Sequence, residues 1–149
     1  MSDLSLRLQQ SASQLPVHSY FDDAIYRVEQ QRIFQAQSRY VGHVRSVPEI
    51  GDYYTLPQES AGRALVRAPT GVQLISNVCR HRQALILQGR GSLLTQQPGS
   101  AAGNLVCPLH RWTYSGGSAD TMAGTLLGAP HFAQDPCLNL ENYPLQEWN

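Results

Sequence analysis

Two short stretches of the sequence each carry one cysteine with one histidine close behind it. In NVCRHR, Cys79 and His81 form a C-x-H pair, and in CPLHRW, Cys107 and His110 form a C-x-x-H pair. Two residues this close together on a tight loop can point at one small object. Two such loops, held side by side by a β scaffold, supply four ligands. The pattern predicts a metal centre on paired loops, and it requires a fold that brings these loops together.

Two kinds of metal centre accept this ligand set. Zinc binds two Cys and two His, although its sites usually take like ligands from one loop, as in C-x-x-C followed by a pair of His. A 2Fe–2S cluster of Rieske type takes two Cys on one iron and two His on the other. The Rieske arrangement explains why each loop carries one sulfur and one nitrogen, because each loop then spans the cluster. Colour distinguishes the alternatives, since a zinc protein is colourless and a Rieske protein is reddish brown.

The composition excludes several classes of protein. The 149 residues contain no Lys, and 11 Arg balance 11 acidic residues, so the formal net charge is zero. A nucleic-acid partner is not expected, because neutralisation of phosphates supplies most of such an affinity. No apolar run reaches the roughly 18 residues of a membrane span, and the N-terminus lacks the apolar segment of a secretion signal. We expect a cytoplasmic protein whose three Cys, an odd count, do not form a disulfide scaffold.

The order of sequence patterns predicts a mainly β fold of small antiparallel sheets with one N-terminal helix. Residues 1–19 form a polar N-terminal segment, and residues 20–149 are expected to form the folded domain. A helix is predicted at about residues 22–35, because apolar residues recur there at helical spacing and Asp22 or Asp23 can cap it. After the helix, short β-rich runs alternate with Gly, Pro and Asp, as is typical of short strands joined by turns.

Specific turns and loops are also expected within the β region. The run RALVRA-PTG-VQLISN predicts a β-hairpin with a three-residue turn at Pro69 to Gly71, leading directly into the first Cys-His stretch. Two segments rich in small and polar residues, 91–103 and 115–124, are interpreted as loops. The final residues, YPLQEWN, have the pattern of a strand that begins there.

The stretch CRHR…CPLHRWTY resembles the Rieske signature of the large subunits of Rieske non-heme iron oxygenases, the aromatic-ring-hydroxylating type. The resemblance runs from about Tyr20 to the end of the chain and includes YVGHVRSVPEIGDYYTL, LVRAPTGVQLISNVCRHR and LLGAPHF. It identifies the chain as the N-terminal Rieske domain of such a subunit. It implies a Rieske 2Fe–2S cluster in which Cys79 and Cys107 bind the buried iron and His81 and His110 bind the outer iron.

The resemblance also suggests roles for residues around the four ligands. Trp112 and Tyr114 match aromatic residues of the family, and we interpret them as packing residues. The Tyr114 hydroxyl is also a candidate donor to a cluster sulfur, which would raise the reduction potential. Arg80 and Arg82, with Arg111 on the second loop, are either solvated or paired arginines or a positive patch for a redox partner.

The remaining Cys and His residues receive structural interpretations. Cys137 lies outside both loops and is expected to be a small buried hydrophobe. His43 and His131 are expected to be structural, although the GAPHF stretch that contains His131 could lie near the cluster. His18 is expected at the surface.

The sequence departs from the family pattern at several places. Twenty-five residues separate His81 from Cys107, which is longer than usual, and we expect the excess to bulge outward at LLTQQPGSAAG. Gln83 and Arg111 stand where Gly is common, and Leu109 replaces a frequent Tyr. Neither loop has the extra Cys of the high-potential respiratory proteins, which favours the lower-potential oxygenase type.

The function implied by the resemblance is one-electron transfer. The cluster takes an electron from a ferredoxin or a flavin reductase and passes it to a mononuclear Fe(II), which uses O₂ to hydroxylate an organic substrate in a mono- or dioxygenase reaction. That iron belongs to a C-terminal catalytic domain absent from this chain, so no catalytic residue is assigned here.

An aromatic ring, with a role in aromatic hydrocarbon catabolism, is the commonest substrate, and a quaternary amine is another. A trimer-like homo-oligomer is expected at full length. The alternative is a free-standing Rieske ferredoxin that only shuttles electrons.

Overall fold

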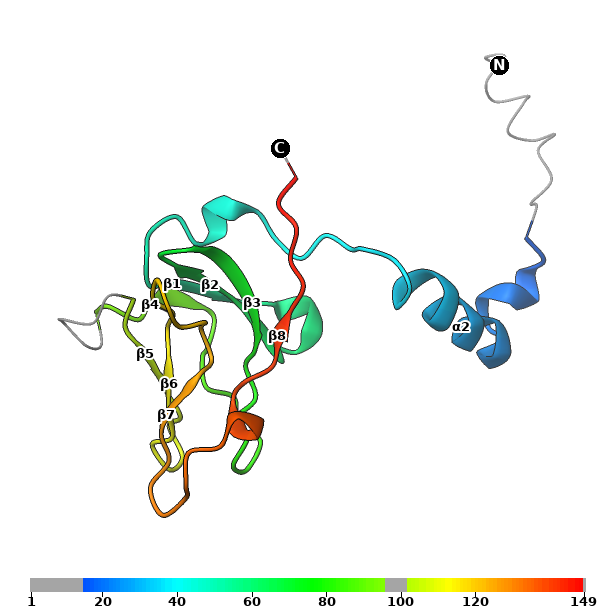
Figure 1. Cartoon of the computed structure of the whole chain (residues 1–149). Coiled ribbons are helices and arrows are strands. Elements are labelled where there is room, and N and C mark those ends of the chain that lie inside the picture. The colour runs from blue at the N-terminus through cyan, green and yellow to red at the C-terminus, as the bar shows by residue number, and fades with distance from the viewer. Residues whose placement is uncertain (1–14, 96–101, 149) are drawn as a thin grey trace. The chain divides into compact units, whose positions relative to one another are not determined.

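The computed structural model describes residues 15–95 and 102–148, and the statements below concern those residues. The chain divides into two compact units, residues 1–40 and residues 41–149. The first unit is helical and the second contains the antiparallel sheets (Figure 1). The predicted mainly β fold class with one N-terminal helix is confirmed, whereas a domain boundary after residue 19 stays a prediction. No helix in the described part of the chain has the length and apolar character needed to cross a membrane.

The N-terminal helix α2 spans Asp23–Glu29 and continues as a π-helical turn over Gln30–Phe34. It begins after Asp22, whose carboxylate accepts hydrogen bonds from two backbone N–H groups of the first turn at 2.8 and 3.4 Å. These bonds satisfy donors that the first turn of a helix cannot pair internally, which explains where the helix starts. The range 22–35 is therefore largely helical, but only its first part is an α-helix.

Two antiparallel sheets form the second unit (Figure 1). The larger sheet has the strand order β4-β1-β2-β3-β8, and the smaller has the order β5-β6-β7. The strands of the larger sheet are β1 (Asp52–Thr55), β2 (Arg63–Ala68), β3 (Gly71–Ser76), β4 (Arg90–Ser92) and β8 (Asn142–Tyr143). The strands of the smaller sheet are β5 (Asn104–Val106), β6 (Thr113–Ser115) and β7 (Leu126–Gly128).

Strands β2 and β3 lie inside the larger sheet and bury side chains on both of its faces. Val66 and Ile75 belong to one apolar cluster, whereas their neighbours Leu65 and Leu74 belong to a second. Successive side chains of a strand point to opposite faces, so each face of the sheet carries one cluster. The first cluster also receives side chains from the smaller sheet and contains the cysteines of both sequence motifs, as Leu105, Tyr114, Leu126, Cys79 and Cys107 show. The two cysteines are therefore part of the core that the sheets share.

The predicted hairpin between β2 and β3 is present, but its turn is shorter than expected. The ladder runs from the pair Arg63 and Ser76 to the pair Ala68 and Gly71, so only two residues, 69 and 70, form the turn. Gly71 is the first residue of β3 and has φ +127°, a backbone conformation that Gly adopts without the clash a Cβ would cause. The prediction of a three-residue turn was wrong because the strand pairing continues through the glycine.

The long spacer before Cys107 is anchored in the core at both of its described ends. Leu93 is fully buried and Ala102 is 1% exposed. Gly103 lies so close to Leu93 that an added Cβ would approach the Leu93 Cβ to 2.5 Å, which explains the need for glycine there. The expected outward bulge falls mainly on residues 96–101, which lie outside the described residues, so it stays a prediction.

The segment between β6 and β7 and the C-terminal strand also differ from the predictions. Between β6 and β7 the chain has no regular structure, as expected for residues 115–124, yet Gly116, Gly117 and Ala123 are buried. At the C-terminal end, the strand β8 ends at Tyr143, and residues 144–148 form no strand. The sequence predicted a strand that begins at Tyr143, the first residue of YPLQEWN. In the structure Tyr143 is instead the last residue of a strand, because only Asn142 and Tyr143 pair with β3.

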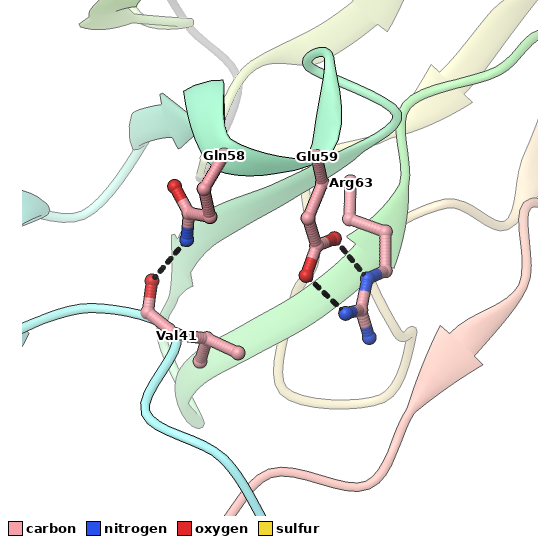
Figure 2. A network of polar contacts seen from close by, with 4 residues as sticks. All are labelled: Val41, Gln58, Glu59 and Arg63. Atoms are coloured by element: carbon pink, nitrogen blue, oxygen red, sulfur yellow. Dashed lines mark hydrogen bonds and ion pairs between the residues drawn. The ribbon is translucent and has the colours of Figure 1, made fainter. Parts of the chain in front are cut away.

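A polar network fastens the turn between β1 and β2 (Figure 2). Glu59, on a 3-10 turn, forms a two-pronged ion pair with Arg63 at the start of β2. Only 16% and 18% of the two side chains is exposed, so water screens this pair less than a fully exposed one. Gln58 of the same turn donates to the Val41 carbonyl at 3.5 Å. The Arg63 guanidinium lies 4.9 Å from the ring centre of Tyr143. These contacts connect the segment before β1 and the strand β8 to the start of β2.

Candidate metal centre

The two Cys-His stretches form loops with the same backbone hydrogen bonds. In the first loop the Cys79 N–H donates to the Ala84 carbonyl at 2.9 Å, and the Gln83 N–H donates to the Cys79 carbonyl at 2.9 Å. In the second loop, Cys107 makes the equivalent bonds, at 2.8 Å to the carbonyl of residue 112 and at 3.0 Å from the N–H of Arg111. Both loops therefore turn the chain back within six residues, each starting at its cysteine, although the spacing from Cys to His differs by one.

The same position in each loop has a left-handed backbone. Gln83 has φ +58° and Arg111 has φ +61°, and both lie four residues after the loop cysteine. Residues with a Cβ pay a steric cost in this region, which Gly avoids. The left-handed backbone explains why Gly is common at these two positions in the resembled family. In this chain both positions hold residues with a Cβ, Gln83 and Arg111, and both carry the steric cost.

The loops bring all four predicted ligands together at one end of the β domain. Cys79 and Cys107 are 1% and 2% exposed and form no disulfide. His81 is partly buried and His110 is exposed, with 4.8 Å between their ring centres and 69° between their ring planes. The thiols therefore lie in the core and the imidazoles toward the surface.

The inner part of this site favours a neutral Cys79 thiol until a metal binds. Burial raises the pKa of the Cys79 thiol, and the neighbouring Cys107 thiol raises it further. The Tyr114 hydroxyl and a backbone N–H of His81 act in the opposite direction. A cation would supply the charge needed to hold both thiolates, because metal ligation deprotonates a thiol.

One ring nitrogen of His81 is left without a partner. Its Nδ1 atom is buried and has no hydrogen-bond partner among the described residues. Burial lowers the pKa of His81, and the neighbouring His110 and Arg82 lower it further, so a neutral ring with a free lone pair is favoured. A buried polar atom without a partner costs free energy, and a bond from this nitrogen to a metal would remove that cost. The donor set therefore fits a metal centre on geometry as well as on residue type.

The described residues contain no group of three or more His, Cys, Asp or Glu placed to hold one metal ion. This finding is compatible with a Rieske cluster, in which each iron takes only two protein ligands, the others being sulfides.

Tyr114, on β6 just after the second loop, reaches the first loop with its hydroxyl. The hydroxyl oxygen lies 3.4 Å from the Cys79 sulfur and accepts a hydrogen bond from the Arg80 N–H at 3.3 Å. Burial raises the pKa of Tyr114, so the hydroxyl keeps its proton. Because the oxygen already accepts from Arg80, its own proton is free to be donated to the sulfur.

Aromatic rings hold His81 in place. The Trp112 ring stacks on the His81 ring at 4.9 Å with only 5° between the planes. Phe132, which follows β7, meets the edges of both rings at 5.4 and 5.0 Å. Trp112 is thus the packing residue that the sequence predicts, whereas Phe132 was only weakly indicated through its place in GAPHF.

Sequence reasoning missed Asn77, which closes the base of the first loop. Its side chain is fully buried and makes three hydrogen bonds. The amide nitrogen donates to the carbonyls of Ala61 and Leu87 at 2.8 and 2.9 Å, and the amide oxygen accepts from the Leu87 N–H at 2.8 Å. The Asn77 side chain therefore forms the same pair of hydrogen bonds with the Leu87 backbone that a neighbouring strand would form. The sequence could have indicated this role, because Asn77 is a polar residue directly after an apolar strand and two positions before Cys79.

The other residues singled out in the sequence are mostly at the surface. Arg80, Arg82 and Arg111 are exposed, and none forms an ion pair within the described part of the chain. His43 is exposed and accepts a hydrogen bond from the Arg45 N–H at 3.0 Å, which is a local structural role. His18 and His131 are also exposed.

Cys137 is exposed, so the expectation of a buried residue was wrong. It lies in a short 3-10 turn, Pro136–Leu138, that begins at Asp135. The Asp135 carboxylate accepts from the Cys137 N–H at 2.8 Å, and the turn directs Leu138 rather than Cys137 against the core.

Comparison with known proteins identifies the family. Residues 37–144 match the family described as the Rieske [2Fe-2S] domain. The chain belongs to this family. It is a Rieske domain of the kind found at the N-terminus of large Rieske oxygenase subunits, and its cofactor is a Rieske-type 2Fe–2S cluster. The predicted family and cofactor are thereby confirmed.

The individual relatives are longer than this chain. It is 53% identical over 151 residues to a putrescine 2-hydroxylase of Ralstonia nicotianae, covering 100% of this chain and 37% of that protein. It is 34% identical over 110 residues to a glycine betaine monooxygenase oxygenase subunit of Chromohalobacter salexigens, covering 73% of this chain and 23% of that protein. Among solved structures, a quaternary ammonium Rieske monooxygenase, CntA, shares the fold with a TM-score of 0.66 at 21% identity, covering 90% of this chain and 35% of that one. The chain therefore spans about a third or less of these proteins.

Proposed function

We propose that Cys79 and Cys107 hold the inner iron of the cluster and that His81 and His110 hold the outer iron. Two buried free thiols beside two imidazoles, one with an unpartnered buried Nδ1, support this assignment. When bound, the cluster supplies a one-electron couple. Two imidazoles in place of two thiolates remove two negative charges from the ligand set. Electron uptake is then easier, with potentials of about −150 to +300 mV against about −400 mV for four-thiolate ferredoxins.

The domain serves as an electron entry point for an oxygenase. The observation that carries this proposal is the graded burial of the ligands: buried sulfurs, a partly buried His81 and an exposed His110. An exposed imidazole gives an electron a short route in from a ferredoxin or flavin reductase. From there it passes to a mononuclear Fe(II) in a catalytic domain outside this chain, where O₂ is activated.

A small aliphatic amine is the substrate that the relatives favour for the complete protein. Relatives that are 53% and 50% identical are named for putrescine and one that is 34% identical for glycine betaine, whereas a relative named for biphenyl, an aromatic compound, is only 28% identical. We therefore propose hydroxylation of an amine such as putrescine in place of the expected aromatic compound. A cytoplasmic location and a trimer-like homo-oligomer of the complete protein are part of the same proposal.

The ligand assignment is tested by iron content and electron paramagnetic resonance. Cys79→Ser and His110→Ala should lose the cluster. Cys137→Ser is the matched control and should keep it, because that thiol is exposed and the first loop contacts this residue at its backbone carbonyl, which accepts from Arg80 at 3.5 Å. Titration of the wild-type chain with a chemical reductant should consume one electron per cluster. Loss of iron from the Cys137 variant would contradict the assignment.

The substrate proposal needs the product of the whole gene. With a reductase and O₂, that protein should hydroxylate putrescine in preference to naphthalene or glycine betaine, as measured by mass spectrometry of the products. The 149-residue chain alone should be reduced without forming any product. Preferential turnover of naphthalene would restore the aromatic interpretation, and product formed by the short chain would reveal a second iron site within it.

A further inference from the structure

A groove lies on the N-terminal helical unit (Figure 1). Residues of the 3-10 turn Val17–Tyr20 and of the helix α2 that follows it both contribute to its walls. Its volume of about 470 Å³ is within the range of about 300 to 1,000 Å³ that is usual for small-molecule sites. The groove belongs to the first unit, whereas the four proposed cluster ligands belong to the second. It is therefore a feature that the metal centre does not account for.

Three aromatic rings line the groove and remain accessible to a ligand. The side chains of Tyr20, Phe21 and Tyr26 are 69%, 83% and 57% exposed. The half-buried Ile25 adds an aliphatic surface beside them. Exposed apolar groups that gather in one place mark a binding surface more often than single ones do. The face of an aromatic ring also attracts a cation, and it favours the methylene groups next to that cation.

Two carboxylates, Asp22 and Glu29, also line the groove and lie on one face of the helix. They are seven positions apart, which is about two turns of 3.6 residues and about 10 Å along the helix axis, and Tyr26 lies between them on that face. Both capping hydrogen bonds of Asp22 end on one oxygen, Oδ1. Among the described residues, Glu29 and the second oxygen of Asp22 have no ion-pair partner, and no Arg lines the groove. Both carboxylates are therefore available to a cation.

We propose that this groove binds a linear aliphatic diamine, with one ammonium group at Asp22, the other at Glu29 and the methylene chain on the Tyr26 ring. In extended 1,4-diaminobutane the two nitrogens are about 6 Å apart by ordinary bond lengths. Each ammonium lies about 2.8 Å from a carboxylate oxygen in a charged hydrogen bond. The ligand therefore spans about 10 to 12 Å between two carboxylates, which agrees with their spacing on the helix.

The spacing also separates this ligand from its shorter relatives. Butylamine has one ammonium group and reaches one carboxylate, and 1,2-diaminoethane is too short to reach both. A bound diamine joins the start of α2 to its last residue, so binding should also stabilise the helix. The ligand class agrees with the substrate proposed for the complete protein, but the inference rests on the groove and involves no reaction.

The test is a titration of the ¹⁵N-labelled chain with 1,4-diaminobutane at low ionic strength, followed by nuclear magnetic resonance. The amide signals of residues 19–30 should shift, and far-UV circular dichroism should show increased helicity. The dissociation constant should be about fivefold or more below those for butylamine and 1,2-diaminoethane, because each of these loses one ion pair. Added salt should weaken binding, since it screens the attraction between exposed charges.

Three substitutions in the groove are compared with a matched control. Asp22→Asn removes a charge but keeps an oxygen that can cap the helix, and Glu29→Gln removes the other charge. Each should raise the dissociation constant about fivefold. Tyr26→Leu removes the ring, keeps a residue that favours helix formation, and should also weaken binding. Asp120→Asn changes the net charge equally at an exposed position of the second unit and should leave the dissociation constant unchanged.

Several results would overturn the proposal. Equal dissociation constants for the three groove variants and the Asp120 control, or for the diamine and butylamine, would mean that the chain attracts cations without a specific site. Shifts of the same amide signals when the protein alone is concentrated would mean that a second copy of the chain covers the groove. Hydroxylation of putrescine by the complete protein without diamine binding to the 149-residue chain would refute the groove and leave the proposed function intact. Binding without hydroxylation would do the reverse.

Discussion

Removal of the Tyr114 hydroxyl tests how the protein sets the potential of the domain. The hydroxyl accepts from the Arg80 N–H at 3.3 Å and lies 3.4 Å from the Cys79 sulfur. When that sulfur is a metal-bound thiolate it has no proton of its own, so the hydroxyl would be the donor. Reduction adds negative charge to the centre, which makes the sulfur a stronger acceptor. The hydrogen bond therefore stabilises the reduced state more than the oxidised state. Tyr114→Phe should lower the reduction potential.

The size of the effect follows from the strength of one hydrogen bond. A bond of this kind has a net value of about 0.5 to 1.5 kcal/mol. For one electron, a tenfold change in an equilibrium constant corresponds to about 59 mV or about 1.4 kcal/mol. If the whole bond were gained on reduction, its loss would lower the potential by about 20 to 60 mV. Part of the bond exists in the oxidised state as well, so these values are upper limits.

The assay is a potentiometric titration followed by visible absorbance and electron paramagnetic resonance. Tyr143→Phe is the matched control, because the Tyr143 hydroxyl also donates one hydrogen bond, to Glu141 at 3.0 Å, but lies on strand β8 away from the loops. The control should keep the wild-type potential. An unchanged or higher potential in Tyr114→Phe, with iron content and spectrum intact, would refute the inference that this hydroxyl donates to the centre.

Three other substitutions follow from the local geometry. Asn77→Ala removes three hydrogen bonds and leaves the Leu87 N–H and carbonyl unpaired in the core, so the unfolding free energy should fall by about 3 kcal/mol or more. A smaller loss in urea denaturation, below about 1 kcal/mol, would contradict the role given to this side chain. Gln83→Gly should stabilise the protein by about 0.5 to 1 kcal/mol through relief of positive φ, and calorimetry showing a lower melting temperature would disprove it. Asp22→Ala should cost about 1 kcal/mol of helix stability, seen as lower helicity by circular dichroism, whereas Asp22→Asn should retain the cap.

The sequence by itself determined the chemistry of this protein and its local structure. A Cys and a His two or three positions apart can point at one small object when they share a tight loop, and the structure places each pair on such a loop. The start of the helix was predictable to Asp22 or Asp23, whereas the positive φ of Gln83 and Arg111 was indicated only by the resemblance to a family in which Gly is common at those positions. Each of these features depends on residues within a few positions of one another. Side-chain chemistry and backbone sterics act at that range without help from the rest of the fold.

The tertiary structure decided which distant residues surround those loops. Phe132 reaches His81 only because β7 returns beside β6, and Asn77 forms hydrogen bonds with Leu87, ten positions further along the chain. The exposure of Cys137 and the two-residue turn before Gly71 were mispredicted for the same reason. Hydropathy favours burial of a Cys, and a Gly favours a turn, but packing against the core and continuation of a strand ladder overrule such local preferences. Contacts of this kind depend on how the two sheets pack against each other, and no short sequence pattern predicts that packing.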